Sequence, residues 1–219
     1  LQFENVFTEG ITKITREDVE YAGELGYRIK HLGIARKTDK GIELRVHPTL
    51  IPERRLIANV DGVMNAVLVQ ADAVGPTLYY GAGAGAEATA SAVVADIVDV
   101  VRALPLNSSD RMPSLGFQDA SIIDSPILPQ EDIQTAYYLR LTVEDKPGAL
   151  ADITNILATQ NISIEAIIQK EPHHGETNLP VIMLTQRTIE KEMNTAISAI
   201  EKLSSVTGQV TRIRLETLG

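Results

Sequence analysis

The chain of 219 residues contains no cysteine. This absence excludes disulfide frameworks, thiolate nucleophiles, cysteine-based zinc sites and iron–sulfur clusters. The sequence also lacks an apolar run of the roughly 18 residues that a membrane span needs, and its start has no basic stretch leading into an apolar signal core. We therefore expect a soluble protein that is not exported, and a cytoplasmic location. The chain opens with Leu1 instead of Met, so we expect it to begin inside a longer reading frame.

Positive charge is scarce and scattered. Lys and Arg number 20 against 29 Asp and Glu, which gives a formal net charge of −9, and no segment is rich in Lys or Arg. Nucleic acids and anionic membrane surfaces both call for clustered positive charge, so neither is an expected partner. Apolar residues make up 44% of the chain and charged residues 22%, which is typical of a globular protein with a core.

Proline and serine gather in one stretch between Leu104 and Gln134, which holds four of the ten prolines. Such a stretch cannot hold a regular element, and a structureless loop of that length is unusual inside a compact domain. We interpret residues 105–135 as a linker between two domains, residues 1–104 and residues 136–219.

Periodicity predicts an open sheet with helices in the first domain. A hydroxyl N-cap and acidic residues predict a helix over residues 16–25. Alternation predicts a β-hairpin from residues 27–35 and 42–46, and a second strand pair from 65–70 and 77–80. Apolar residues at helical spacing then predict a helix over residues 87–104.

The second domain has clearer boundaries. Strands are predicted over residues 137–143, 162–168, 179–184 and 210–215, with helices over residues 149–159 and 189–203. The order βαββαβ is the ferredoxin-like split βαβ arrangement. The predicted fold class of the whole chain is therefore α+β.

A glycine-rich loop, Gly81-Ala82-Gly83-Ala84-Gly85, lies between a predicted strand and a predicted helix. Small residues let a ligand or another backbone approach closely, and the following helix offers free N–H groups to a phosphate. The same residues also suit tight packing of a helix against a strand. The loop lacks the Gly-Lys-Ser/Thr of a P-loop and the context of a Rossmann fingerprint, so both interpretations stay open.

A second candidate site is the turn from Asp145 to Leu150. It places backbone N–H groups at a helix start, which suits a carboxylate, and Asn161 and Ser163 enter the adjacent strand where they could bond the polar atoms of an amino acid. The alternative is a turn selected only for its geometry.

The four histidines do not form a catalytic or metal site. His173 and His174 are adjacent in a polar loop without a carboxylate at metal-ligand spacing, so we expect solvated loop residues. His31 and His47 are expected to be structural or interfacial. Without a Gly-x-Ser-x-Gly elbow, no Ser–His–Asp arrangement is inferred, and no metal is predicted.

Several strings of the first domain, read together, resemble bacterial homoserine dehydrogenases in order and spacing. They are Arg45-Val46-His47-Pro48-Thr49-Leu50-Ile51-Pro52, Gly62-Val63-Met64-Asn65-Ala66-Val67, and Tyr80 to Gly85 followed by Thr89-Ala90-Ser91-Ala92-Val93 and Asp96, with Phe7-Thr8-Glu9-Gly10-Ile11 before them. The second domain is similar to ACT domains, small-molecule regulatory modules that follow the catalytic domain in many of these enzymes.

The resemblance implies NAD- or NADP-dependent interconversion of L-homoserine and L-aspartate 4-semialdehyde, on the route to threonine, methionine and isoleucine. It also implies a homodimer with an ACT module for feedback control. The family's nucleotide fingerprint and catalytic groups lie upstream of Leu1, so no catalytic residue is assigned in this chain, and the chain alone is expected to be inactive.

Two sets of site residues follow from the resemblance. Gly81, Ala82, Gly83, Ala84 and Gly85 match the late glycine-rich segment that touches the cofactor. The ACT turn and the following strand, where an amino acid such as threonine would bind between paired domains, are matched by Asp145, Gly148, Ala149, Leu150, Asn161 and Ile162. Two alternatives remain open: a stand-alone amino-acid-binding regulator without catalysis, and an ACT domain that serves only in assembly.

Overall fold

The computed structural model describes residues 3–107, 111–113, 116–169 and 178–218. The chain forms two compact units, residues 1–58 with 125–219 and residues 59–124. The two units are defined by which residues lie close together in space. The division into sequence domains at the linker, residues 105–135, stays a prediction. Among the described residues, no helix is long and apolar enough to cross a membrane.

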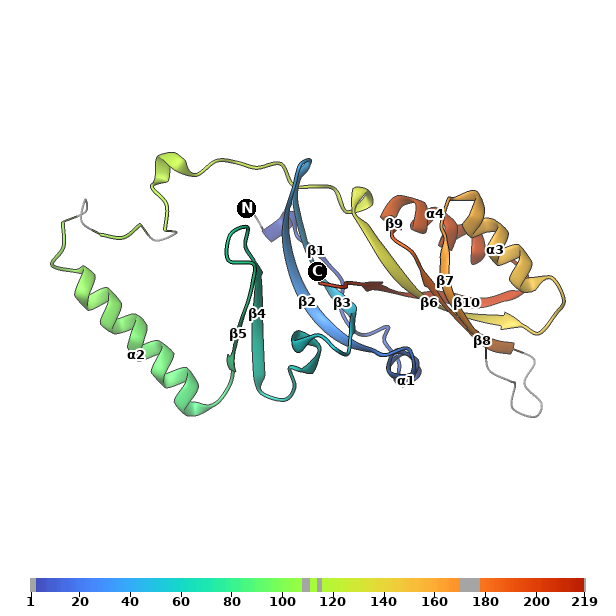
Figure 1. The fold of residues 1–219 in the computed structure, drawn as a ribbon, viewed down its shortest axis with the longest axis horizontal. Helices are drawn as coiled ribbons and strands as arrows, with labels where there is room; N and C mark the ends of the chain where they lie inside the picture. Colours follow the sequence, from blue (N-terminus) through green and yellow to red (C-terminus); the bar gives the residue numbers. More distant parts are fainter. Residues whose placement is uncertain (1–2, 108–110, 114–115, 170–177, 219) are drawn as a thin grey trace. The chain divides into compact units, whose positions relative to one another are not determined.

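The described residues of the larger unit form an eight-stranded sheet and three α-helices (Figure 1). Its elements are β1 (Phe7–Thr8), α1 (Arg16–Glu24), β2 (Tyr27–Thr38), β3 (Gly41–Pro52), β6 (Gln134–Glu144), α3 (Ala149–Thr159), β7 (Ile164–Gln169), β8 (Asn178–Thr185), β9 (Thr188–Ile189), α4 (Glu190–Ile200) and β10 (Val206–Leu215).

Strands β6, β7, β8 and β10 with helices α3 and α4 confirm the predicted βαββαβ order. The strands lie in the order β10-β6-β8-β7, and each neighbouring pair is antiparallel. This arrangement is the ferredoxin-like one, and it confirms the predicted α+β class.

The sheet has a helical layer on each face. Apolar residues at every second position of β6, such as Leu139 and Leu141, point to one face of the sheet and pack with Ile153 of α3 and Met193 of α4. On the opposite face, Tyr138 packs with Tyr21 of α1. The predicted helix over residues 16–25 is confirmed, and Thr15 and Asp18 close a capping box at its start.

The hairpin of the first domain is longer than predicted and joins the sheet of the second. Strand β3 continues beyond residue 46 to Pro52, and its far end lies parallel to β10 with Thr49 opposite Arg214 and Leu50 opposite Leu215. Sequence alternation predicts that each strand is half-buried, but not which distant strand will be its neighbour. The two predicted domains therefore share one sheet.

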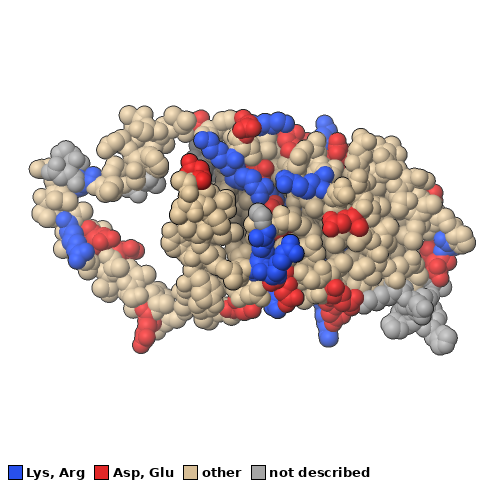
Figure 2. Space-filling model, viewed as in Figure 1, with Lys and Arg blue, Asp and Glu red and all other residues tan. Residues whose placement is uncertain are grey.

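The smaller unit holds β4 (Met64–Gln70), β5 (Pro76–Ala82) and α2 (Ala86–Ala103), which confirm the predicted strand pair and the helix after it. The two strands form a separate antiparallel sheet. In Figure 2 most of the visible surface over β4 and β5 is uncharged, whereas over β2 and β3 basic side chains lie among acidic ones.

Candidate functional site

The glycine-rich loop connects the end of β5 to the start of α2. The Gly83 N–H donates to the carbonyl of Val63 at 2.9 Å, which holds the loop against the start of β4. A Cβ on Gly83 would lie 1.5 Å from Nδ2 of Asn65, so the Asn65 amide occupies the space that any larger side chain would need. Gly83 is thus required by a close approach within its own unit.

The start of α2 could hold an anion through its backbone. Gly85 is the N-cap residue and gives no side-chain hydrogen bond, and the first helical bond runs from Thr89 to Gly85 at 3.0 Å. The N–H groups of the first turn have no partner within the helix, and they carry the positive end of its dipole. This geometry suits a nucleotide phosphate. The negative charge of Glu87 in the same turn, however, repels an anion bound there.

The predicted regulatory turn lies between β6 and α3. Gly148 has φ of 95°, a left-handed conformation that L side chains rarely adopt, and it is the N-cap residue of α3. Asp145 and Gly148 are exposed. Ala149 and Ile162, by contrast, have 5% and 4% of their surface exposed and belong to the core, which leaves little of either residue for a ligand to contact. Leu150 packs partly against that core, and Asn161 has a positive φ of 55°.

The two described histidines lie in neighbouring strands of the larger unit. His31 lies in β2, where Nε2 is 3.1 Å from the carbonyl oxygen of Glu9. His47 lies inside β3 and is fully buried, instead of at the strand end that its Pro48 neighbour suggested. His173 and His174 lie outside the described residues. Within the described ranges, no three His, Asp or Glu side chains gather where they could hold a metal ion.

The larger unit contains three clusters of buried charge that the sequence did not predict. In the first, Asp18 of α1 accepts from the Tyr138 hydroxyl at 3.0 Å and from Arg140 Nε at 2.6 Å. Burial raises the pKa of Asp18. Hydrogen bonds from Arg140 and Thr15 lower it by a larger amount, so the pKa of Asp18 lies below its usual value. This cluster attaches α1 to β6.

The second cluster surrounds Arg214 of β10, whose side chain is 1% exposed. Its Nε donates to Glu190 Oε2 at 2.9 Å, and its Nη1 donates to Glu9 Oε2 at 2.8 Å. The Tyr137 hydroxyl donates to Glu190 as well, at 2.6 Å. Burial raises the pKa of Glu190, but the hydrogen bonds and charge of Arg214 bring it below its usual value.

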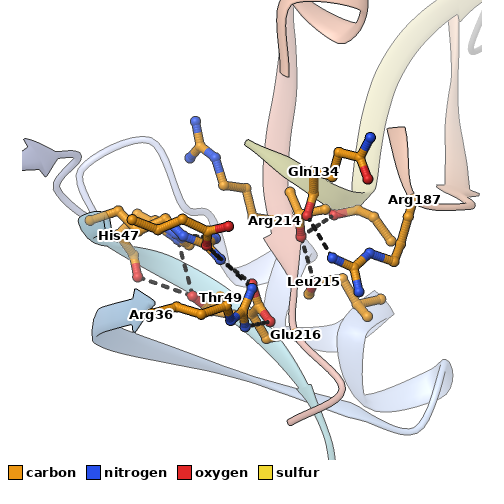
Figure 3. A network of polar contacts seen from close by, with 12 residues as sticks. Arg36, His47, Thr49, Gln134, Arg187, Arg214, Leu215 and Glu216 are labelled. Carbon is orange, nitrogen blue, oxygen red and sulfur yellow. Dashed lines mark hydrogen bonds and ion pairs between the residues drawn. The ribbon is translucent and has the colours of Figure 1, made fainter. Parts of the chain in front are cut away.

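The third cluster includes His47 and Glu216 (Figure 3). Glu216 accepts from Arg45 Nη2 at 2.5 Å and from Arg36 Nη2 at 2.9 Å. His47 Nε2 is 3.1 Å from Arg45 Nη1, and Nδ1 is 2.9 Å from the Pro48 carbonyl. Because the guanidinium can only donate, Nε2 accepts, and the proton lies on Nδ1. Burial and the nearby charges of Arg214 and Arg45 lower the pKa of His47 to about 4.

All three clusters connect the first 58 residues with residues 137–216. The sequence did contain a sign of these clusters, since Arg212 and Arg214 of β10 and Glu216 just after it alternate with apolar residues. Alternation alone predicts a charged face in solvent. The segment around Glu9 and the end of β3 covers that face instead.

Comparison with known proteins finds a separate match for each of the two ends of the chain. Residues 1–98 match the family model described as homoserine dehydrogenase, and residues 137–205 match that of the ACT domain. The whole chain is 58% identical over 218 residues to the homoserine dehydrogenase of Pseudomonas aeruginosa and 55% identical to that of Neisseria gonorrhoeae, and it covers 50% of each.

A solved structure supports the same assignment. A homoserine dehydrogenase from Thiobacillus denitrificans is 63% identical and superposes with a TM-score of 0.91 over 100% of this chain and 49% of its own. The chain spans about half the length of the relatives that it matches. The chain is therefore similar to a homoserine dehydrogenase segment over residues 1–98 and to an ACT domain over residues 137–205.

Proposed function

We propose that the chain is part of a homoserine dehydrogenase that interconverts L-homoserine and L-aspartate 4-semialdehyde with NAD or NADP in the cytoplasm. The similarity over the whole chain, 58% identity across 218 residues with a relative of that name, carries the proposal. It favours the enzyme over a stand-alone regulator because the relatives are named as dehydrogenases. The product would serve threonine, methionine and isoleucine biosynthesis.

In this proposal the chain contributes part of the cofactor site and no reacting side chain. The cofactor, when bound, accepts or delivers the hydride. The backbone of Gly81 to Gly85 and the first turn of α2 would contact its phosphates, which the helix start without a side-chain cap supports. We propose that the catalytic groups lie in the part of the relatives' length that this chain does not span.

The test compares the complete enzyme, its Gly83→Ala variant and the 219-residue chain in a homoserine oxidation assay. We expect activity in the complete enzyme and none in the chain alone. Because a Cβ at Gly83 must displace Asn65, the variant should raise the KM for the nucleotide about 10-fold, which is about 1.4 kcal/mol of binding.

Gly33→Ala is the matched control, because a Cβ at Gly33 meets only Val46 Cγ2 at an ordinary 3.9 Å. It should change the KM less than twofold. A complete enzyme that does not oxidise homoserine with either nucleotide would refute the proposed function, and equal KM values in both variants would refute the role of the loop.

We further propose that the ACT domain binds an amino acid effector, L-threonine first among the candidates, at the turn between β6 and α3. The exposed Asp145, the left-handed Gly148 and the start of α3 support this proposal. Thermal unfolding of the chain tests it. Threonine at about 10 times its Kd should stabilise by about 1.4 kcal/mol, which raises the Tm by about 3 to 6 °C. D-threonine should give no shift, and a flat response to L-threonine would exclude it as the effector.

A homodimer is proposed from the smaller unit. Helix α2 has 18 residues and none is buried within the chain. The large apolar side chains exposed on α2, on its C-cap residue and on β4 and β5 are Val67, Val69, Tyr79, Tyr80, Val93, Val94, Ile97, Val98, Val100, Val101 and Leu104. An apolar surface of this kind marks a contact with another protein surface, and we propose that part of it is the dimer interface.

A further inference from the structure

A cleft of about 670 Å³ lies in the larger unit, at a distance along the chain from the regulatory turn. Its walls are residues 9–15 of the homoserine dehydrogenase segment on one side and α4 with the middle of β10 on the other. None of the six predicted regulatory residues lines it. Its volume lies within the range of small-molecule sites, about 300 to 1,000 Å³.

The floor of the cleft is rigid. Arg140 is 15% exposed, and its guanidinium donates to Asp18, to Thr15 Oγ1 at 3.3 Å and to Thr211 Oγ1 at 3.1 Å. The charge of Arg140 is thus paired with Asp18, and its N–H groups are taken up by partners within the protein instead of by a ligand. The register of β10 against β6 shifts between Thr207 and Thr211, and this irregular part of β10 faces the cleft.

Three charged groups on the walls have capacity left for a ligand. Lys13 is exposed and makes no ion pair with any residue that the structure describes. Arg212 Nη1 forms an ion pair with Glu190 Oε1, at 3.2 Å, and donates a hydrogen bond to Asn194 Oδ1. Glu201 accepts the Val210 N–H at 2.9 Å through Oε1, which leaves Oε2 for another donor. A guanidinium has five N–H groups, so Arg212 too can donate further.

Apolar groups complete the lining. Ile197 and Val210 are partly buried against the core below α4, and Ile14 packs against the core of the opposite face. The lining also includes Arg140 and Glu9, whose charges are already paired within the protein, so Lys13, Arg212, Glu201 and a small aliphatic wall remain for a ligand. The cations suit a carboxylate, Glu201 suits an ammonium group, and the wall suits an aliphatic side chain.

We propose that this cleft is a second binding site, for a free α-amino acid with a short aliphatic side chain. Lys13 and Arg212 bind its carboxylate, and Glu201 binds its ammonium group. One wall of the cleft belongs to the homoserine dehydrogenase segment and the other to the ACT domain and the strand after it. A bound ligand therefore contacts both parts, and it acts on the homoserine dehydrogenase segment by direct contact. Binding at this cleft does not depend on the proposed dehydrogenase activity.

Isothermal titration of the 219-residue chain with L-threonine, L-isoleucine and L-methionine tests the inference. At least one should bind saturably with a Kd of about 1 mM or below. Lys13→Met and Glu201→Gln should each raise that Kd at least 10-fold. The glutamine keeps an acceptor for the Val210 N–H, so the fold is preserved. Lys40→Met, at the exposed tip of the β2–β3 hairpin, is the matched control and should leave the Kd unchanged.

Asp145→Ala separates this site from the regulatory turn. It should leave binding at the cleft intact. The proposal is overturned if none of the three amino acids binds, or if either Lys13→Met or Glu201→Gln leaves every Kd unchanged. Binding that is lost only in Asp145→Ala would assign the effector to the turn and overturn the cleft, while the dehydrogenase proposal would be unaffected.

Discussion

Replacing Arg214 by Met should lower the free energy of unfolding by about 3 to 5 kcal/mol, which is the cost of removing one partner from a buried ion pair. Arg214 is 1% exposed and pairs with Glu190, which is 2% exposed, and with Glu9. The variant leaves Glu190 with only Arg212 and the Tyr137 hydroxyl, and it removes the ion pair of Glu9. Urea unfolding of the chain measures the loss.

The size of the effect follows from what Arg214 connects. Glu190 is the first residue of α4, Glu9 follows β1, and the Arg214 guanidinium also lies 4.8 Å from the ring centroid of Phe7. One side chain thus joins the ACT domain's last strand and second helix to the homoserine dehydrogenase segment. Among these groups Glu190 depends most on Arg214, because the hydrogen bonds and charge of Arg214 are what offset the effect of burial and lower the pKa of Glu190.

Arg16→Met is the matched control, because Arg16 forms an exposed pair with Glu20, at side-chain exposures of 91% and 58%. Exposed pairs of this kind contribute little, so the change should stay within about 0.5 kcal/mol. The double variant Arg214→Met with Glu190→Met should recover part of the loss, since it leaves no uncompensated charge at position 190. A loss below about 1 kcal/mol in Arg214→Met would contradict the assigned role.

The sequence predicted the elements of the ACT domain well because each is specified locally. The helix over residues 149–159 is found at the predicted bounds, since its apolar positions recur at helical spacing and Gly148 precedes it. The predicted helix over residues 189–203 is shorter, Glu190–Ile200, as helix ends are the least determined by periodicity. The glycine-rich loop was also placed correctly between strand and helix.

Pairing between distant segments could not be predicted in the same way. The alternation of apolar and polar residues predicts a strand that ends at residue 46, before His47 and Pro48. The structure continues β3 to Pro52, where Leu50 accepts from the Glu216 N–H at 3.0 Å. Partners this far apart in sequence leave no periodic trace in either strand, so the charged cleft and the buried clusters were also missed.

The buried polar residues of β3 lead to an acid-sensitive fold. His47 is fully buried with its neutral ring held by Arg45 and by the Pro48 carbonyl, and its pKa is lowered from 6.5 to about 4. In the unfolded chain the same ring takes up a proton near pH 6.5. Below that pH the unfolded state therefore binds more protons than the folded state, and stability falls as the pH falls.

We expect the free energy of unfolding to drop by about 2 kcal/mol between about pH 7.5 and about pH 5, through His47 alone. Asp18, Glu190 and Glu216 also have lowered pKa values, but their ordinary values are 3.8, 4.5 and 4.5, so the stability they contribute is lost below that window. Urea unfolding at a series of pH values measures the slope. His47→Gln keeps an acceptor for Arg45 and should flatten it, whereas His31→Gln, an exposed histidine of β2, should leave it unchanged. An equal slope in the wild type and in His47→Gln would show that the acid sensitivity does not come from His47.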